Sequence, residues 1–176
     1  MRHLKYGLGL VAAVCALVAI QVGPKLEHTD SPVESGRFAG STWRLISLEP
    51  ATSDRQLPPG TKPLTAVIGV TPGDAAASTS MAKGCDASVR DGRDRIWGPA
   101  SGVTGREAVS TLCTKLDKKY KAVLATPGVE VTWQASFVVP ADAVSSLLVE
   151  VRLDGVPDFV RLAPPAPAAG MRPPAG

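Results

Sequence analysis

The stretch VEVTWQASFVV, residues Val129–Val139, alternates between apolar and mostly polar side chains. A repeat of two residues indicates a β-strand with one buried face. That face would carry Val129, Val131, Trp133, Ala135, Phe137 and Val139. Pro140 follows directly and ends the strand, because proline cannot donate a hydrogen bond to a neighbouring strand. The stretch therefore predicts a half-buried strand and a mainly β domain around it.

Similar short runs lie on both sides of this strand. They are Ser41–Leu48, Leu64–Val70, Cys85–Arg90, Arg93–Trp97, Leu147–Leu153 and Phe159–Leu162. Asp91-Gly92 separates two of them, and a two-residue Asp-Gly link is the preferred signal for a type I′ hairpin. About seven strands with frequent turns predict a β-sandwich or a β-barrel over residues 38–162.

The segment 106–122 has a helical pattern instead. Thr104 and Glu107 have the spacing of a capping box. Apolar side chains recur after them at helical spacing: Val109, Leu112, Cys113, Leu116, Tyr120 and Val123. The sequence leaves two structures open here, a helix over 106–122 or a strand around Cys113 followed by a loop. Four lysines share this segment with Asp117, and they fit a solvated face better than a binding patch: Lys115, Lys118, Lys119 and Lys121.

The C-terminal strands resemble a known family. The strings WQASFVVPADA (133–143), SLLVEVRL (146–153) and FVRL (159–162) are similar to the last strands of telokin-like, immunoglobulin-type domains. Such domains occur in uncharacterised actinobacterial secreted and membrane-anchored proteins. The resemblance implies an Ig-like β-sandwich of about seven strands and a role in adhesion or binding rather than catalysis. The helix-like segment 106–122 departs from the family's pattern.

The N-terminus predicts a membrane anchor. A short basic stretch, residues 1–5, precedes an apolar run, 6–22, that is just long enough to span a bilayer. The basic residues predict that residues 1–5 stay in the cytoplasm and that the rest of the chain is extracytoplasmic. No A-x-A-like site follows the run, so an uncleaved anchor is favoured over a cleaved signal peptide, which would leave the protein secreted.

The remaining segments follow from composition. Gly23–Arg37 contains Pro, Gly and charges without an apolar period, which predicts a linker before the domain at 38–162. Residues 163–176 read APPAPAAGMRPPAG and predict a disordered Pro/Ala-rich tail. Cys15 lies inside the apolar run, and Val14 before it does not fit a lipobox, so a buried thiol is favoured over lipid attachment.

Cys85 and Cys113 are the two cysteines of the predicted domain. An extracytoplasmic compartment permits disulfides, so their pairing is the first hypothesis. A redox-active pair would have C-x-x-C spacing, which these two residues lack. The sequence therefore predicts a structural Cys85–Cys113 disulfide.

Charge and motifs argue against several functions. Acidic and basic residues nearly balance and are interspersed over 38–162, so no basic face for nucleic acid is expected. His3 and His28 are the chain's histidines and both precede the domain, which leaves a Ser-His-Asp triad without its base. The domain has no zinc or EF-hand motif, and arginines alternate with the aspartates that could suggest calcium, Asp86, Asp91 and Asp94. No catalytic residue, cofactor or metal is expected.

The three tryptophans are expected at two kinds of position. Trp43 and Trp133 fall on the apolar phase of their strands and are expected in the core, whereas Trp97, beside Gly98-Pro99, is the one expected surface contact.

The predicted function is a membrane-anchored, extracytoplasmic binding module without catalytic activity, with a protein or another cell-envelope component as partner. The alternative is an accessory subunit of an envelope complex that acts through its membrane helix, and an envelope enzyme is a remote third reading.

Overall fold

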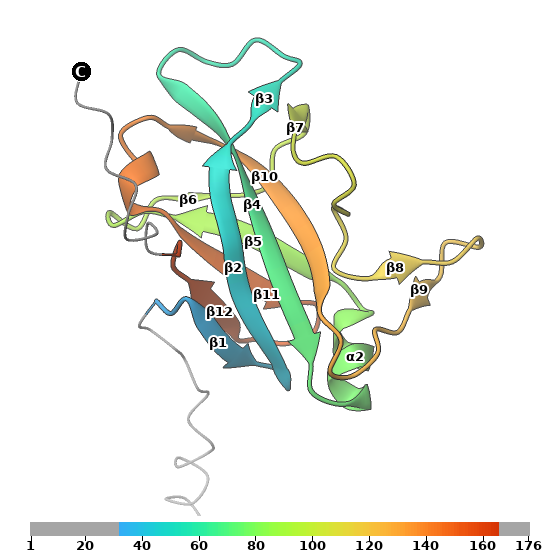
Figure 1. Ribbon diagram of the computed structural model, residues 1–176. Coiled ribbons are helices and arrows are strands. Elements are labelled where there is room, and N and C mark those ends of the chain that lie inside the picture. Colours follow the sequence, from blue (N-terminus) through green and yellow to red (C-terminus); the bar gives the residue numbers. More distant parts are fainter. Residues whose placement is uncertain (1–31, 166–176) are drawn as a thin grey trace, which may run out of the picture.

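The computed structural model describes residues 32–165 of the 176-residue chain. This part is mainly antiparallel β-structure, which confirms the mainly β prediction (Figure 1). Its elements are β1 (Ser35–Phe38), β2 (Ser41–Pro50), β3 (Thr52–Ser53), β4 (Thr61–Pro72), α2 (Ala75–Met81), β5 (Cys85–Arg90), β6 (Ile96–Trp97), β7 (Val103–Thr104), β8 (Lys115–Leu116), β9 (Ala122–Val123), β10 (Val131–Pro140), the 3-10 turn η1 (Val144–Ser146), β11 (Leu148–Leu153) and β12 (Phe159–Leu162).

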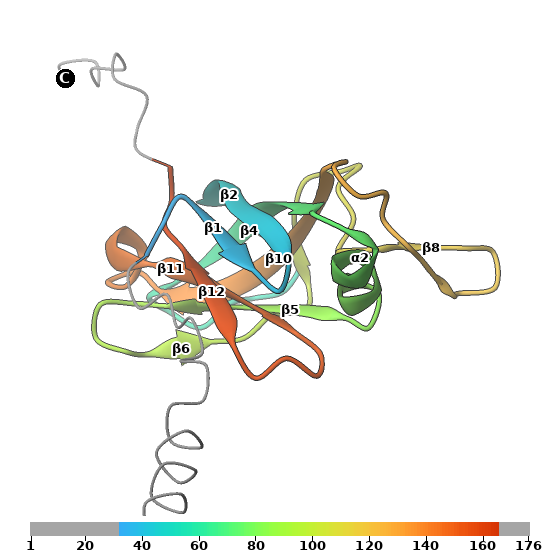
Figure 2. The same cartoon turned by 90° about the horizontal axis from the view of Figure 1, so that it is seen from below.

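Two four-stranded sheets form the body of the molecule (Figures 1 and 2). One sheet has the strand order β1-β2-β4-β10, and the other has the order β12-β11-β5-β6. The longest pairing joins β10 to β4, from Val131 opposite Val70 to Pro140 opposite Thr61. The stretch 129–139 therefore forms a strand as predicted, except that Val129 precedes the strand and is exposed.

Backbone hydrogen bonds connect the two sheets along both sides. On one side, the amide of Val33 donates to the carbonyl of Arg161 at 3.2 Å, and the amide of Ala163 donates to the carbonyl of Val33 at 3.0 Å. On the other side, the amide of Ala100 donates to the carbonyl of Ser136 in β10 at 2.7 Å. These bonds cover strand edges that would otherwise be open to pairing with another chain.

The core lies between the sheets and contains two of the three tryptophans. Trp43 and Trp133 are buried, as their positions in the apolar phase predict. The Nε1 of Trp43 donates to the carbonyl of Phe38 at 3.1 Å, so the polar group of this indole is satisfied. Residues 64–70 of the central strand β4 are all buried, which explains why this run is almost entirely apolar rather than alternating; its one polar side chain is Thr65.

Glu150 is a buried carboxylate on β11, with only 1% of its surface exposed. Its Oε1 accepts hydrogen bonds from the Nε of Arg90 at 2.8 Å and from an Nη of Arg161 at 2.9 Å. A buried charge is tolerated only when it is paired and hydrogen-bonded. Glu150 therefore links the neighbouring strands β5 and β12 and has a structural role.

Strand β1 begins at Ser35, inside the range 23–37 that the sequence assigns to a linker. Its sequence SGRF is too short and too polar to show an apolar pattern, because Phe38 is the one large apolar side chain that it buries in the core. Backbone pairing with β2 holds the rest of the strand. Ala39 and Gly40 connect the two strands with φ values of 49° and 75°, as a type I′ turn requires. The folded domain therefore starts before Phe38.

The predicted two-residue hairpin at Asp91-Gly92 is wrong. Strand β5 ends at Arg90 and β6 begins at Ile96, so residues 91–95 form the connection. The Oδ1 of Asp91 accepts from the backbone amides of Arg93 at 2.9 Å and Arg95 at 3.0 Å, and its Oδ2 accepts from the Nε of Arg95 at 2.8 Å. An aspartate that binds amides further along the chain stabilises this wider loop.

The helix considered over 106–122 does not form. Strands β8 and β9 instead pair as a short hairpin that follows an irregular segment. Cys113 is bonded to Cys85, and the side chain of Gln134 binds backbone groups of Arg106 and Val109. These long-range contacts override the helical spacing of the apolar residues.

Helix α2 was not predicted from the sequence. It begins after Asp74, whose Oδ1 accepts from the amide of Ala77 at 2.7 Å and caps the helix. Within residues 32–165, no helix is long and apolar enough to cross a membrane. The predicted anchor at 6–22 lies outside the described residues, as do residues 1–5 and most of the predicted linker and tail.

The predicted disulfide is present. Cys85 at the start of β5 is bonded to Cys113 before β8, and their Cα atoms are 6.0 Å apart. The two cysteines are 28 residues apart in sequence, and the bond attaches the segment before β8 to the second sheet.

Removing this bond by changing both Cys85 and Cys113 to alanine is expected to lower the free energy of unfolding by roughly 3–4 kcal/mol. The reason is that the unfolded chain regains the entropy of the open loop. Chemical denaturation of the oxidised protein and the double variant measures the difference. Cys15→Ala, which removes a thiol outside the bond, is the control. Equal stability of the double variant and the oxidised protein would contradict the expectation.

The carboxyl group of Asp91 is expected to make the stability of the fold depend on pH. Burial raises the pKa of its carboxyl, but hydrogen bonds from Arg95 and Arg93 outweigh burial and leave the pKa below its ordinary value. The carboxylate therefore stabilises the fold above about pH 4, and this stabilisation is lost as the pH falls through the lowered pKa. Asp91→Asn is expected to be less stable than the wild type at neutral pH, by a margin that narrows in acid.

Urea denaturation over a pH series measures this margin. Asp54→Asn, on an exposed loop, is the control, and its difference from the wild type is expected to stay small. A margin for Asp91→Asn that is unchanged from neutral pH to acid would show that the carboxylate does not act in this way.

Candidate interaction surface

Strands β8 and β9 form a hairpin that projects from the body of the molecule (Figures 1 and 2). We refer to residues 112–126 as the hairpin segment. In both views it lies opposite the side on which the described chain begins and ends. The hairpin segment is therefore accessible and distant from the points where the rest of the chain continues.

Asp117 builds the tip of the hairpin segment. Its Oδ1 accepts from the amides of Lys119 at 2.7 Å and Lys121 at 2.9 Å, and its own amide donates to the carbonyl of Lys121 at 2.8 Å. Tyr120 has a φ of 59°, which is uncommon for a residue other than glycine, and 86% of its surface is exposed. The tip is therefore a fixed turn that presents a tyrosine to solvent.

Two contacts hold the base of the hairpin segment. Cys113 is buried and bonded to Cys85. Gln134 of β10, also buried, accepts from the amide of Arg106 at 2.8 Å and donates to the carbonyls of Arg106 at 2.9 Å and Val109 at 2.8 Å. The chain that leads into the hairpin is therefore fixed along β10 although it lacks regular structure.

The hairpin region exposes most of the large apolar side chains that residues 32–165 expose. Six of eight lie here: Leu112, Leu116, Tyr120, Val123, Leu124 and Val129. A groove of about 420 Å³ runs between the hairpin segment and the start of β10, and Leu112, Val123, Leu124 and Val129 contribute to its lining. Grouped apolar side chains on a surface mark interaction sites more often than isolated ones do.

Four lysines accompany these apolar side chains: Lys115, Lys118, Lys119 and Lys121. The hairpin segment contains one acidic residue, Asp117, whose carboxylate binds backbone amides of the tip. Within residues 32–165 none of these lysines forms an ion pair, whereas several arginines do. The surface is therefore both apolar and positively charged.

Trp97, the aromatic expected as a surface contact, lies elsewhere. It belongs to β6, on the other side of the molecule from the hairpin segment (Figure 1). Its ring packs partly buried against the core, and the guanidinium of Arg95 lies 5.3 Å from the ring centroid. Its ring is therefore partly covered rather than freely presented.

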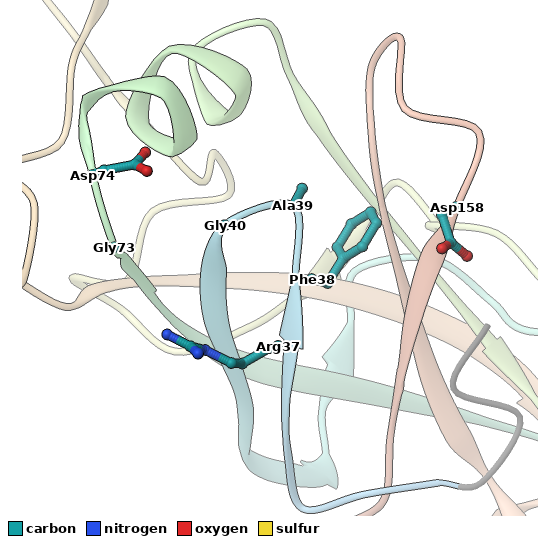
Figure 3. A pocket seen from close by; sticks show the side chains of 7 residues that line it. All are labelled: Arg37, Phe38, Ala39, Gly40, Gly73, Asp74 and Asp158. Atoms are coloured by element: carbon teal, nitrogen blue, oxygen red, sulfur yellow. The ribbon is translucent and has the colours of Figure 1, made fainter. Parts of the chain in front are cut away.

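A second cavity, of about 460 Å³, lies beside the Ala39-Gly40 turn (Figure 3). Its two carboxylates, from Asp74 and Asp158, lie on opposite sides of this turn. Asp74 caps helix α2, and Asp158 accepts from the amide of Phe159 at 2.9 Å. Both side chains have structural roles, and they do not converge on a common point.

The three aspartates that could suggest a calcium site, Asp86, Asp91 and Asp94, do not lie together as a group of ligands either. Asp91 is bound by Arg95, Asp94 pairs with Arg90 at 3.0 Å, and Asp86 accepts from the amide of its neighbour. In the part of the chain that the structure describes, no three His, Cys, Asp or Glu side chains form a group able to hold a metal ion.

Sequence reasoning missed the hairpin segment as a surface. It left a helix and a strand open for this segment and assigned only the lysines, as a solvated face, whereas the structure also exposes Leu112, Leu116 and Tyr120. The available signal was the mixture of lysines and apolar residues between Leu112 and Leu124, because a solvated face usually lacks large apolar side chains.

In comparisons with known proteins, no protein-family model, no curated protein and no solved structure matches this chain. The candidate surface is therefore defined by its own geometry, exposure and charge.

Gln134→Ala is expected to lower the free energy of unfolding by about 2 kcal/mol, because it leaves backbone groups of Arg106 and Val109 without their partners. It is also expected to speed amide exchange over residues 105–112. Denaturation and hydrogen exchange measure the two effects. Thr132→Ala, at an exposed position on the same face of β10, is the matched control. Unchanged exchange in the Gln134 variant would show that this side chain does not hold the segment.

Proposed function

We propose that this chain is a membrane-anchored, extracytoplasmic interaction module without catalytic activity. The hairpin segment is its contact surface for a negatively charged, amphipathic component of the cell envelope. One observation carries the proposal, namely that six of the eight exposed large apolar side chains within residues 32–165 gather at this hairpin and its groove. Because four lysines accompany them, a partner that offers both apolar groups and negative charge is complementary.

The location is supported by residues 1–22 and by the disulfide. A basic start followed by an apolar run of spanning length favours an anchor with the N-terminus in the cytoplasm. The Cys85–Cys113 bond fits an oxidising, extracytoplasmic compartment. Cleavage after the same apolar run would release the same domain as a secreted protein, which is the alternative location.

We also propose a relation to immunoglobulin-type sandwiches that is limited to one sheet. The order β12-β11-β5-β6 corresponds to G-F-C-C′ of variable-type domains. The other sheet departs from A-B-E-D, because the partner of β2 is β4, which precedes β5 in the chain, whereas the partner of B is E, which follows C. The proposed kinship therefore supports a binding role only in general terms.

A non-catalytic role is supported by how the acidic side chains are used. Glu150 and Asp91 are buried against arginines, and Asp74 caps a helix. Acid–base catalysis needs ionisable groups that converge on a substrate-sized site. The carboxylates of the cavity in Figure 3 do not converge in this way.

Photo-crosslinking of the full chain in intact cells tests the proposal. A photoreactive amino acid in place of Leu124 is expected to form adducts with another envelope component, whereas the same replacement of Ile96, which is similarly exposed on β6, is the control. Protease added outside the cytoplasmic membrane is expected to digest the domain while the anchor stays in the membrane.

Three outcomes would contradict parts of this proposal. An absence of adducts at position 124 would remove the hairpin segment as a contact surface. Protection of the domain from external protease would place it on the cytoplasmic side. Loss of the adducts when residues 6–22 are replaced by an unrelated membrane helix would favour the accessory-subunit alternative.

A further inference from the structure

We infer that the envelope component that meets the tip of the hairpin segment is the anionic lipid surface of the membrane itself. This inference rests on the proposed function, since it names the partner of the same surface and uses the same anchor. It would make the hairpin segment a second membrane contact, distant from the first.

The shape of the tip suits a deformable partner. The hairpin projects from the body (Figures 1 and 2), so its end is convex rather than hollow. Asp117 fixes the turn, and Tyr120 at its end is 86% exposed. A prearranged tip loses little conformational entropy when it is bound. A lipid headgroup layer accepts such a protrusion without needing a pocket of matching shape.

The choice of lysine over arginine argues against a protein partner. Protein interfaces are enriched in arginine and depleted in lysine. Elsewhere this domain pairs carboxylates with arginines through two hydrogen bonds each, as in Arg44–Glu130 at 2.7 and 2.7 Å and Arg106–Glu49 at 2.6 and 2.8 Å. The hairpin segment contains no arginine. Lysines act as flexible point charges that suit a diffuse negative surface.

The electrostatic attraction is large enough to matter. Each lysine near an anionic bilayer favours binding by about fivefold. The three lysines of the tip, Lys118, Lys119 and Lys121, would therefore contribute about a hundredfold together. Asp117 opposes them only in part, and its carboxylate is turned to backbone amides.

The apolar side chains add a second contribution. Tyrosine is enriched at membrane–water interfaces, where its ring lies among the headgroups and its hydroxyl stays in water. Leu116 and Val123 are exposed on the two strands behind the tip. Apolar side chains combined with lysines characterise segments that lie in the interface rather than cross it.

The proposed anchor brings a membrane within reach. Residues 23–31, between the apolar run and the first described residue, span at most roughly 30 Å. A tether of this length keeps the local concentration of membrane high, so a weak contact is sufficient. Because the hairpin lies opposite the chain's point of entry (Figure 1), contacts at both ends would hold the domain along the membrane surface.

Hydrogen exchange on the full chain in lipid nanodiscs tests the inference. One set of discs contains phosphatidylcholine only, and the other contains equal parts of phosphatidylcholine and phosphatidylglycerol. Amides of residues 112–126 are expected to exchange several-fold more slowly in the anionic discs, and added salt is expected to reduce the difference. Peptides from β11, which is buried in the sheet, are expected to exchange equally in both.

A charge-matched pair of variants locates the effect. The triple variant K118Q/K119Q/K121Q is expected to abolish the difference between the discs. The control R37Q/R55Q/K62Q removes the same charge from exposed positions outside the hairpin segment and is expected to retain the difference.

The other outcomes would overturn the inference. Equal exchange of residues 112–126 in both discs would exclude a lipid contact while leaving the anchor intact. Protection in native envelopes but in neither disc would identify a protein occupant instead. Failure of the chain to enter any disc would overturn the proposed anchor, and with it this inference. Failure of the lipid contact alone can therefore be told apart from failure of the proposed anchor.

Discussion

The Cys85–Cys113 disulfide is the constraint on which the candidate surface depends. Residues 98–130 connect β6 to β10 with little regular structure. A segment with this many apolar side chains would gain free energy by folding back onto the body. The bond holds Cys113 in the core, and Gln134 fixes the chain just before it. The apolar residues that follow, among them Leu116 and Leu124, remain exposed.

The same domain divides its positive charges between two tasks. Arginines are used where geometry matters, as around Glu150, whose burial is acceptable because Arg90 and Arg161 bind it. Lysines are concentrated on the hairpin segment, where they form no ion pair within residues 32–165. A guanidinium matches a carboxylate in two hydrogen bonds, whereas an ammonium attracts negative charge without fixed geometry. The lysines of the hairpin segment therefore have no ion-pair geometry within residues 32–165, and the proposed contact relies on this property.

The predictions from sequence succeeded where local patterns determine structure. The alternation around Trp133 and the apolar phase of Trp43 identified buried strand faces, because a strand's side chains alternate between its two faces whatever its neighbours. The disulfide followed from having two cysteines in a domain predicted to be exported. Strand β1 was missed because it buries a single large apolar side chain, Phe38, and is otherwise held at the sheet edge by backbone pairing that the sequence does not show.

The candidate surface could not be predicted in the same way. The spacing of Leu112, Leu116 and Tyr120 favours a helix locally, and the contacts that prevent the helix come from Cys85 and Gln134, far away in sequence. Nothing in the apolar pattern itself shows that these side chains would be exposed. Only the lysines between them carried that information, and they were read as an ordinary solvated face.

The tip of the hairpin segment is a defined turn that leaves Tyr120 exposed. Holding Tyr120 at a φ of 59° costs about 1–2 kcal/mol, because an L-residue clashes with its own backbone in this region. Asp117 offsets that cost with two hydrogen bonds to the turn. A chain under no further constraint could place glycine at this position and remove the strain. Ala39, Asp94 and Ala108 also have positive φ values, so this strain alone does not mark a partner site. Under the proposed function, the strained turn matters because it keeps an exposed aromatic ring between lysines in a fixed conformation.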